Sequence, residues 1–264
     1  MTNADSYIPY PKQKTVDTCI ISNASSQMRT TVGPASFRIN VTSTPIPGET
    51  NSIVSGQAGQ VQVIALDQNG ATFSSYQGTV HFSSGDTIAT LPADYTYTSS
   101  DAGTHTFNVT LKTVAGNTAT RDLSVQDSGT GVSSVQNINI WFQVIATREG
   151  LVGGQTSCGH IITPGDHFVA LPATSLCNAG VRLRNGSNLV ATTVLDVGPW
   201  CPNTPSPRNS NTCSCPSDRY WQTSGLPFAA TASCATTHAG IDLADGTFAD
   251  LGLTNNANIY WRFQ

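Results

Sequence analysis

Two aspartates in the C-terminal half of this sequence, Asp196 and Asp242, are our candidates for acid–base chemistry. Each lies in a short apolar segment, VLDV at 194–197 and GIDL at 240–243. Burial raises the pKa of a carboxyl group, and a second carboxylate close by raises it further. Such a pair can keep one proton near neutral pH and donate it. The structural alternatives are that Asp196 caps the turn before Gly198 and that Asp242 hydrogen-bonds to the backbone.

Aromatic side chains lie between these aspartates in a loop rich in Pro and Ser. Trp200, Tyr220 and Trp221 are suited to stacking against sugar rings, and they could equally form a small core of the loop itself. His238, four residues before Asp242, is either part of the same groove or a surface residue. We therefore predict that these four side chains take part in substrate binding.

The cysteines indicate disulfides. Six of the seven fall after residue 150: Cys158, Cys177, Cys201, Cys213, Cys215 and Cys234. An even set confined to one small domain is typical of proteins from oxidising compartments, so we expect a secreted or cell-surface location. A zinc site is the alternative, but paired CxxC motifs are absent from the sequence. We expect no metal and no cofactor. The spacing does not reveal which cysteines pair.

Composition excludes several other functions. Charged residues make up 11% of the 264 residues and the formal net charge is −4, which disfavours a nucleic-acid partner. The sequence contains no apolar run long enough to cross a bilayer and no recognisable signal peptide at its start. A nucleophile-elbow motif of serine hydrolases is also absent from the sequence. We expect a monomer.

The first part of the chain has the pattern of a β-sandwich. Residues 1–33 show no clear period and are predicted to be an extended lead-in. From residue 34 to 144, period-2 runs alternate with turn sequences, which predicts an immunoglobulin-like β-sandwich. The segment Asp101–His105 resembles the Asp-x-Gly-x-Tyr corner of such domains, with His in the Tyr position. We expect a spacer or binding module here.

The second part, residues 145–264, predicts a small barrel. Its candidate strands are His167–Leu171, Gly180–Arg184, Val190–Val197 and Asn258–Phe263. One helical turn is expected at Asp245–Leu251, with an Asp as its cap. Short strands, frequent turns and a single helix together favour an all-β chain in which a sandwich precedes a six-stranded barrel.

Three segments of this second part resemble expansins. Residues 240–252 (GIDLADGTFADLG), with the IYWRF strand that follows, are similar to the end of the expansin catalytic-type domain. Residues 194–201 (VLDVGPWC) resemble its Val-Thr-Asp strand, and residues 146–150 (ATREG) resemble its opening strand. The resemblance covers nearly all of residues 146–264. It implies a double-psi β-barrel, as in barwin-like proteins, rare lipoprotein A, family-45 endoglucanases and membrane-bound lytic transglycosylases.

The resemblance also implies roles for particular residues. Asp242 takes the place of the groove aspartate and is the expected general acid, with Asp196 as its neighbour. Thr147 takes the place of the groove threonine and is expected to orient the acid. The groove tyrosine of expansins would fall at Gly198. The base that family-45 enzymes carry on the first strand has no match, although Glu149 lies nearby.

These roles predict a protein that acts on cell-wall polysaccharide, either peptidoglycan or a β-glucan. One possibility is cleavage by a glycoside hydrolase or lytic transglycosylase with Asp242 as general acid. Inverting hydrolysis requires a second carboxyl group about 6.5–9.5 Å away, whereas a transglycosylase needs one carboxyl group. The alternative is a non-hydrolytic expansin- or barwin-like protein that binds and loosens the wall. A structural surface protein is a third interpretation.

Overall fold

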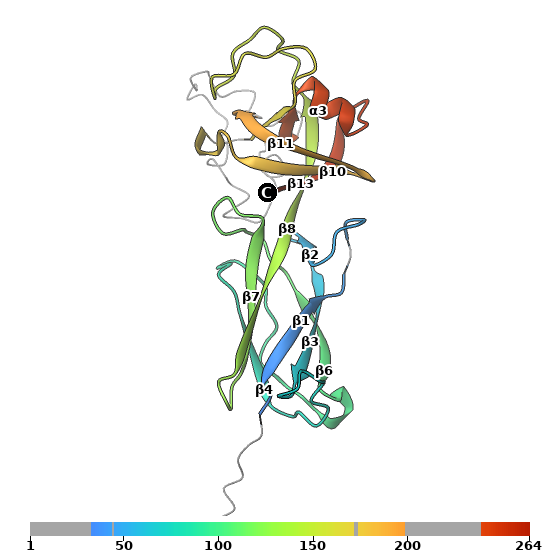
Figure 1. Cartoon of the computed structure of the whole chain (residues 1–264), viewed down its shortest axis with the longest axis vertical. Helices are drawn as coiled ribbons and strands as arrows, with labels where there is room; N and C mark the ends of the chain where they lie inside the picture. Colours follow the sequence, from blue (N-terminus) through green and yellow to red (C-terminus); the bar gives the residue numbers. More distant parts are fainter. Residues whose placement is uncertain (1–32, 44, 172–173, 199–238) are drawn as a thin grey trace, which may run out of the picture. The chain divides into compact units, whose positions relative to one another are not determined.

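The described chain is almost entirely β-structure (Figure 1). The computed structural model describes residues 33–43, 45–171, 174–198 and 239–264, so the predicted lead-in lies outside it except for Gly33. The strands are β1 (Ser36–Val41), β2 (Ser52–Val54), β3 (Gly59–Leu66), β4 (Thr79–Ser83), β5 (Tyr95–Thr96), β6 (Thr104–Val109), β7 (Thr120–Asp127), β8 (Ser133–Arg148), β9 (Phe168–Ala170), β10 (Gly180–Asn185), β11 (Asn188–Asp196), β12 (Ala239–Leu243) and β13 (Ala257–Phe263). One α-helix, α3 (Asp245–Asp250), and two 3-10 turns, η1 (Ser99–Asp101) and η2 (Thr174–Leu176), complete the described elements. The predicted all-β class with one short helix is confirmed.

The N-terminal strands form two sheets that share a hydrophobic core. β1, β3 and β6 make an antiparallel sheet in the order β1–β3–β6. The second sheet contains β5, β4, β7 and β8 in that order, with β2 parallel to β8. On β3, Val61, Val63 and Ala65 are fully buried while the residues between them are exposed or half-buried. This alternation is what a strand with one buried face requires.

The corner predicted before β6 is held together by side-chain hydrogen bonds and ring stacking. His105 Nδ1 lies 2.7 Å from Asp101 Oδ1, and the Tyr95 hydroxyl donates to the same carboxylate at 3.1 Å. The Tyr95 and His105 rings stack with centroids 4.1 Å apart. These bonds tie the end of η1 to β5 and β6.

Strand β8 is shared by the sandwich and the barrel (Figure 1). It pairs with β7 and β2 up to Trp141, and with β13 and β12 from Phe142 onward. Its even-numbered residues from Ile138 to Ala146 are buried in the main core. Its odd-numbered side chains therefore point to the opposite face, where Trp141 is covered by a separate cluster that includes Ile46.

The barrel is closed and six-stranded. The strand order is β12–β9–β11–β10–β13–β8, and β8 also pairs with β12. The β8–β12 and β9–β11 pairs are parallel, and the remaining pairs are antiparallel. Each of the four strands predicted from the sequence is found with its ends within two residues of the predicted ones. The prediction of a six-stranded barrel is confirmed.

Helix α3 follows β12 and packs its Phe248 side chain into the core. Gly246 allows the start of the helix to lie close to the loop before β9, because a Cβ there would lie 2.3 Å from the Gly165 carbonyl oxygen. Asp245 is not the helix cap that the sequence predicted: the N-cap is Ala244, and Asp245 instead binds Arg148 Nε at 2.6 Å. None of the helices in the described residues has the length and hydropathy needed to cross a membrane.

Candidate active site

Asp196, Asp242 and Thr147 are brought together on the outer face of the barrel by strand register. Asp196 on β11 is registered with Ala170 on β9, and Ala170 is registered with Asp242 on β12. Asp242 is registered in turn with Thr147 on β8. Since neighbouring strands lie about 4.8 Å apart, the Asp196 and Asp242 backbones are about 9–10 Å apart, with a small alanine between them. The three predicted residues therefore belong to one site.

A bulge in β11 turns Asp196 toward this face. Val194 points into the core, so strict alternation would place Asp196 in the core as well. The register instead shifts between Val194 and Asp196. Bulges of this kind redirect a side chain, and they are common beside functional sites. As a result, Asp196 shares a face with Asp242.

Two backbone donors hold the Asp196 carboxylate. Its Oδ1 accepts hydrogen bonds from the Ser157 N–H at 2.7 Å and from the Val197 N–H at 2.8 Å. Ser157 precedes Cys158, whose disulfide to Cys177 confirms one pair of the predicted cysteines. The bond to Val197 matches the turn-capping alternative for Asp196, but the bond to Ser157 comes from a distant loop. Asp196 thus has a structural role within the site.

Asp242 is partly buried and has one side-chain donor. The Thr147 hydroxyl donates to Asp242 Oδ1. Burial raises the pKa of Asp242, the Thr147 hydrogen bond lowers it, and the Asp196 charge raises it, with a net upward shift. No backbone N–H donates to this carboxylate among the described residues. Burial of Asp242 thus outweighs the hydrogen bond from Thr147 and shifts its pKa upward.

Gly198 lies close against the Asp242 carboxylate. A Cβ at Gly198 would lie 2.8 Å from Asp242 Oδ2 and 3.5 Å from the Ala170 Cβ. The chain after β11 therefore passes directly over the row of registered residues. Any side chain at this position would displace the Asp242 carboxylate.

Glu149 is a third carboxyl group in the same site. It follows β8, extends the ladder by donating its N–H to the Leu243 carbonyl at 2.7 Å, and lies on the same face as Thr147. Burial, as the largest cause, and the charges of Asp196 and Asp242 together raise the pKa of Glu149 to about 7. Its Oε2 is buried and receives no hydrogen bond from the residues that the structure describes.

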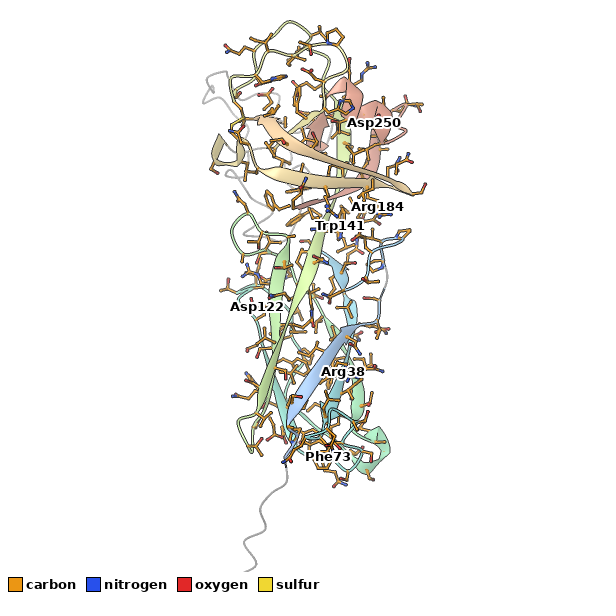
Figure 2. The ribbon with its side chains drawn as sticks, in the orientation of Figure 1. Arg38, Phe73, Asp122, Trp141, Arg184 and Asp250 are labelled. Carbon is orange, nitrogen blue, oxygen red and sulfur yellow. A yellow bond between two sulfur atoms is a disulfide. The ribbon has the colours of Figure 1, made fainter. Side chains whose placement is uncertain are left out.

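The other charged groups near the barrel mouth have partners of their own. Arg148 binds Asp245 on the opposite face of β8. His160 Nε2 lies 2.7 Å from Asp166 Oδ2, and His167 Nε2 lies 2.9 Å from Asp250 Oδ2 on α3. Figure 2 shows Asp250 on the helix, and its side chain is 58% exposed. In the described residues, the hydrogen-bond partners of these two histidines are Asp166 and Asp250, not the carboxyl groups of the site.

Several predicted residues lie outside the described residues. These are Trp200, His238, Tyr220 and Trp221 among the substrate-binding residues, and Cys201, Cys213, Cys215 and Cys234 among the disulfide candidates. Their roles remain predictions. Within the described residues, no group of three or more His, Cys, Asp or Glu side chains is arranged to hold a metal ion.

From the sequence, Glu149 was identified only as a residue near the first strand of the barrel. The available signal was the period of β8, since Thr147 and Glu149 are two positions apart and must share a face if the strand continues. What the sequence did not show is how far the strand continues.

One family model matches part of the chain. A family model described as a domain of unknown function (DUF8814) matches residues 140–225. This match starts within β8 and includes Glu149 and Asp196, and it ends before Asp242. No curated protein matches the chain.

Proposed function

We propose that this protein is a secreted cell-wall-active protein that cleaves a glycan, peptidoglycan or a β-glucan, with Asp242 as general acid. The observation that carries the proposal is the meeting of three carboxyl groups, Glu149, Asp196 and Asp242, on one face of a closed barrel. The expansin-like segments of the sequence support a double-psi barrel of this class. The proposal concerns this site and leaves the sandwich as a spacer or binding module.

The chemistry requires a carboxyl group that is still protonated near neutral pH. Asp242 donates its proton to the glycosidic oxygen, and the bond from that oxygen to the anomeric carbon breaks with its electron pair on the oxygen. Water, or a hydroxyl of the same sugar, then adds to the anomeric carbon, and its proton passes to a carboxylate of the site. A burial-raised pKa at Asp242, with a hydroxyl from Thr147 to orient it, suits the first step.

A direct test compares the wild type with Asp242→Asn and with Asp250→Asn. The first change removes the acid, and the second makes the same chemical change at an exposed carboxylate on α3. Each protein is incubated with purified peptidoglycan and with soluble β-glucans, and released fragments are identified by mass spectrometry. We expect fragments from the wild type and from Asp250→Asn, and a loss of about 100-fold or more in Asp242→Asn.

The nature of the fragments distinguishes the reactions. Anhydro-muramyl ends indicate transglycosylation, and ends that have gained water indicate hydrolysis. Fragments released equally by Asp242→Asn would refute the role of Asp242. Binding to the polysaccharides without any fragments would refute cleavage and favour the non-hydrolytic alternative, for which the structural bonds to Asp196 are the supporting observation.

A further inference from the structure

We propose that Arg182 and Arg262, on the outer face of the barrel, form a binding site for an oxyanion, which is a carboxylate or a phosphate group. The two arginines belong to β10 and β13, and these strands carry none of the carboxyl groups of the candidate active site. The inference goes beyond the proposed function, because it concerns the binding of an anion and requires no cleavage.

Strand register places the two arginines side by side. Arg182 and Arg262 are directly opposite each other in the antiparallel β10–β13 pair. Both side chains point out of the barrel, because the residues before and after each of them are buried in the main core: Val181, Leu183, Trp261 and Phe263. Residues directly opposite each other have Cβ atoms about 4.5–5.5 Å apart. The two guanidinium groups can therefore reach the same ligand.

The two positive charges are unfavourable in this position without an anion. Like charges directly opposite each other destabilise a sheet. Among the residues that the structure describes, the arginines in ion pairs are Arg148 and Arg184, and neither Arg182 nor Arg262 meets a carboxylate. Burial is the largest cause that lowers the pKa of Arg262, and repulsion by Arg182 adds to it, whereas Glu49 acts in the opposite direction. An oxyanion between the two guanidinium groups replaces this repulsion by attraction.

A third arginine on the same face adds to the positive charge. Arg184 lies two residues after Arg182, so both point the same way. Its Nη2 lies 3.1 Å from Glu49 Oε1, which occupies the carboxylate that contacts this face in the described part of the chain. The Nε atoms of Arg184 and Arg262 are both buried and have no acceptor among the described residues. Hydrogen-bond donors therefore outnumber acceptors here. Arg184 is labelled in Figure 2.

Arg262 is held in a fixed position below the exposed Arg182. Its guanidinium carbon lies 5.2 Å from the centre of the Trp141 ring, and its Nη1 donates to the Phe263 carbonyl at 3.0 Å. Trp141 is fully buried, so it is a rigid support for the cation. A side chain that is already ordered loses less entropy when a ligand binds. Arg182 is exposed, which lets an anion approach from solvent.

Tyr260 supplies a neutral donor to the same face. It lies two residues before Arg262 and is registered with Arg184. Its hydroxyl oxygen accepts a hydrogen bond from Gln143 Nε2 at 3.5 Å, which leaves its O–H able to donate. Guanidinium groups bind the paired oxygens of carboxylate and phosphate groups through two parallel hydrogen bonds. The chemistry of this face therefore suits an oxyanion.

The test compares the wild type with Arg182→Gln. This change removes one charge from an exposed side chain and keeps a polar amide. Arg38→Gln is the matched control, because Arg38 is an exposed arginine on β1 of the sandwich. Each protein is titrated at low ionic strength, where screening is weak, with inorganic phosphate, polyphosphate, polygalacturonate and neutral dextran. Binding is measured by calorimetry and by the NMR shifts of the arginine Nε–H groups.

We expect the wild type and Arg38→Gln to bind the anions with affinities within about twofold of each other. Arg182→Gln should bind at least about tenfold more weakly, because a charge-assisted hydrogen bond is lost. Dextran should not bind. Polygalacturonate as the tighter polymer would identify a carboxylate ligand, and polyphosphate as the tighter one would identify a phosphate ligand. Binding of inorganic phosphate without either polymer would identify the free ion.

Melting temperature gives a second and independent measurement. Without added anion, Arg182→Gln should melt at a higher temperature than the wild type, since the repulsion with Arg262 is gone. Inorganic phosphate should raise the melting temperature of the wild type, because a ligand of the folded state stabilises it. The same addition should have a smaller effect on Arg182→Gln.

Three results would overturn the inference. The first is a wild type that binds none of the anions. The second is an equal loss of affinity in Arg38→Gln and Arg182→Gln, which would indicate a general effect of net charge. The third is equal binding of dextran and the acidic polymers. None of these measurements involves cleavage, so failure of the proposed function would leave them unchanged.

Discussion

Replacing Cys158 and Cys177 together by alanine tests how much the disulfide contributes to the stability of the barrel. The disulfide joins residues 19 positions apart, and the loop that it closes contains β9. The loss of chain entropy in the unfolded state for a closed loop of about 20 residues corresponds to about 3 kcal/mol at 25 °C. We expect the free energy of unfolding of the double variant to fall by about this amount. Changing both residues avoids leaving a free thiol.

The assay is equilibrium unfolding in urea, with the free energy obtained by linear extrapolation. Ser175→Ala, at an exposed position in η2 within the same loop, is the matched control and should change the free energy by less than about 0.5 kcal/mol. Fragment release is the second readout, because Ser157, which lies next to the disulfide, donates its N–H to Asp196. A loss below about 1 kcal/mol in the double variant would refute the loop-entropy reasoning.

Four further changes test the packing and the site. Between pH 4.5 and about 7 the native state holds a proton on Glu149 that the unfolded state releases, so wild-type stability should fall as pH rises through this window. The slope, about 1.4 kcal/mol per pH unit at most for this one group, should be lost in Glu149→Gln, as measured by unfolding at several pH values. Thr147→Val removes the hydroxyl donor to Asp242 and should raise the Asp242 pKa further, followed by carboxyl NMR shifts. Gly198→Ala places a Cβ 2.8 Å from Asp242 Oδ2 and should reduce fragment release by up to about 100-fold, with little change in melting temperature. Trp261→Ala, at a core position that is 1% exposed, should cost about 3–5 kcal/mol in urea unfolding, and a loss under about 1 kcal/mol would contradict the packing described above.

Much of the local structure follows from the sequence alone. Period-2 runs predicted the strands of the first part, and the four short barrel strands predicted from the sequence begin and end close to their predicted residues. This worked because a strand with one buried face must alternate apolar and polar side chains. The helix after β12 was predicted as well, but Asp245 was wrongly predicted as its cap, since Asp245 binds Arg148 on the neighbouring strand β8.

The composition of the site depended on tertiary structure. Alternation along β11 would have sent Asp196 into the core, and a register shift against β9 placed it beside Asp242 instead. The Ser157 donor and the Cys158–Cys177 pair depend on a loop folding back, which spacing does not specify.

Glu149 shows the same division between sequence and structure. The sequence determined that Thr147 and Glu149 share a face, because side chains two residues apart on a strand point the same way. Only the closure of β8 against β12 continued the strand far enough to bring Glu149 to the two aspartates. Its pKa of about 7 depends on burial and on charges from other strands, which exist only once the barrel has formed.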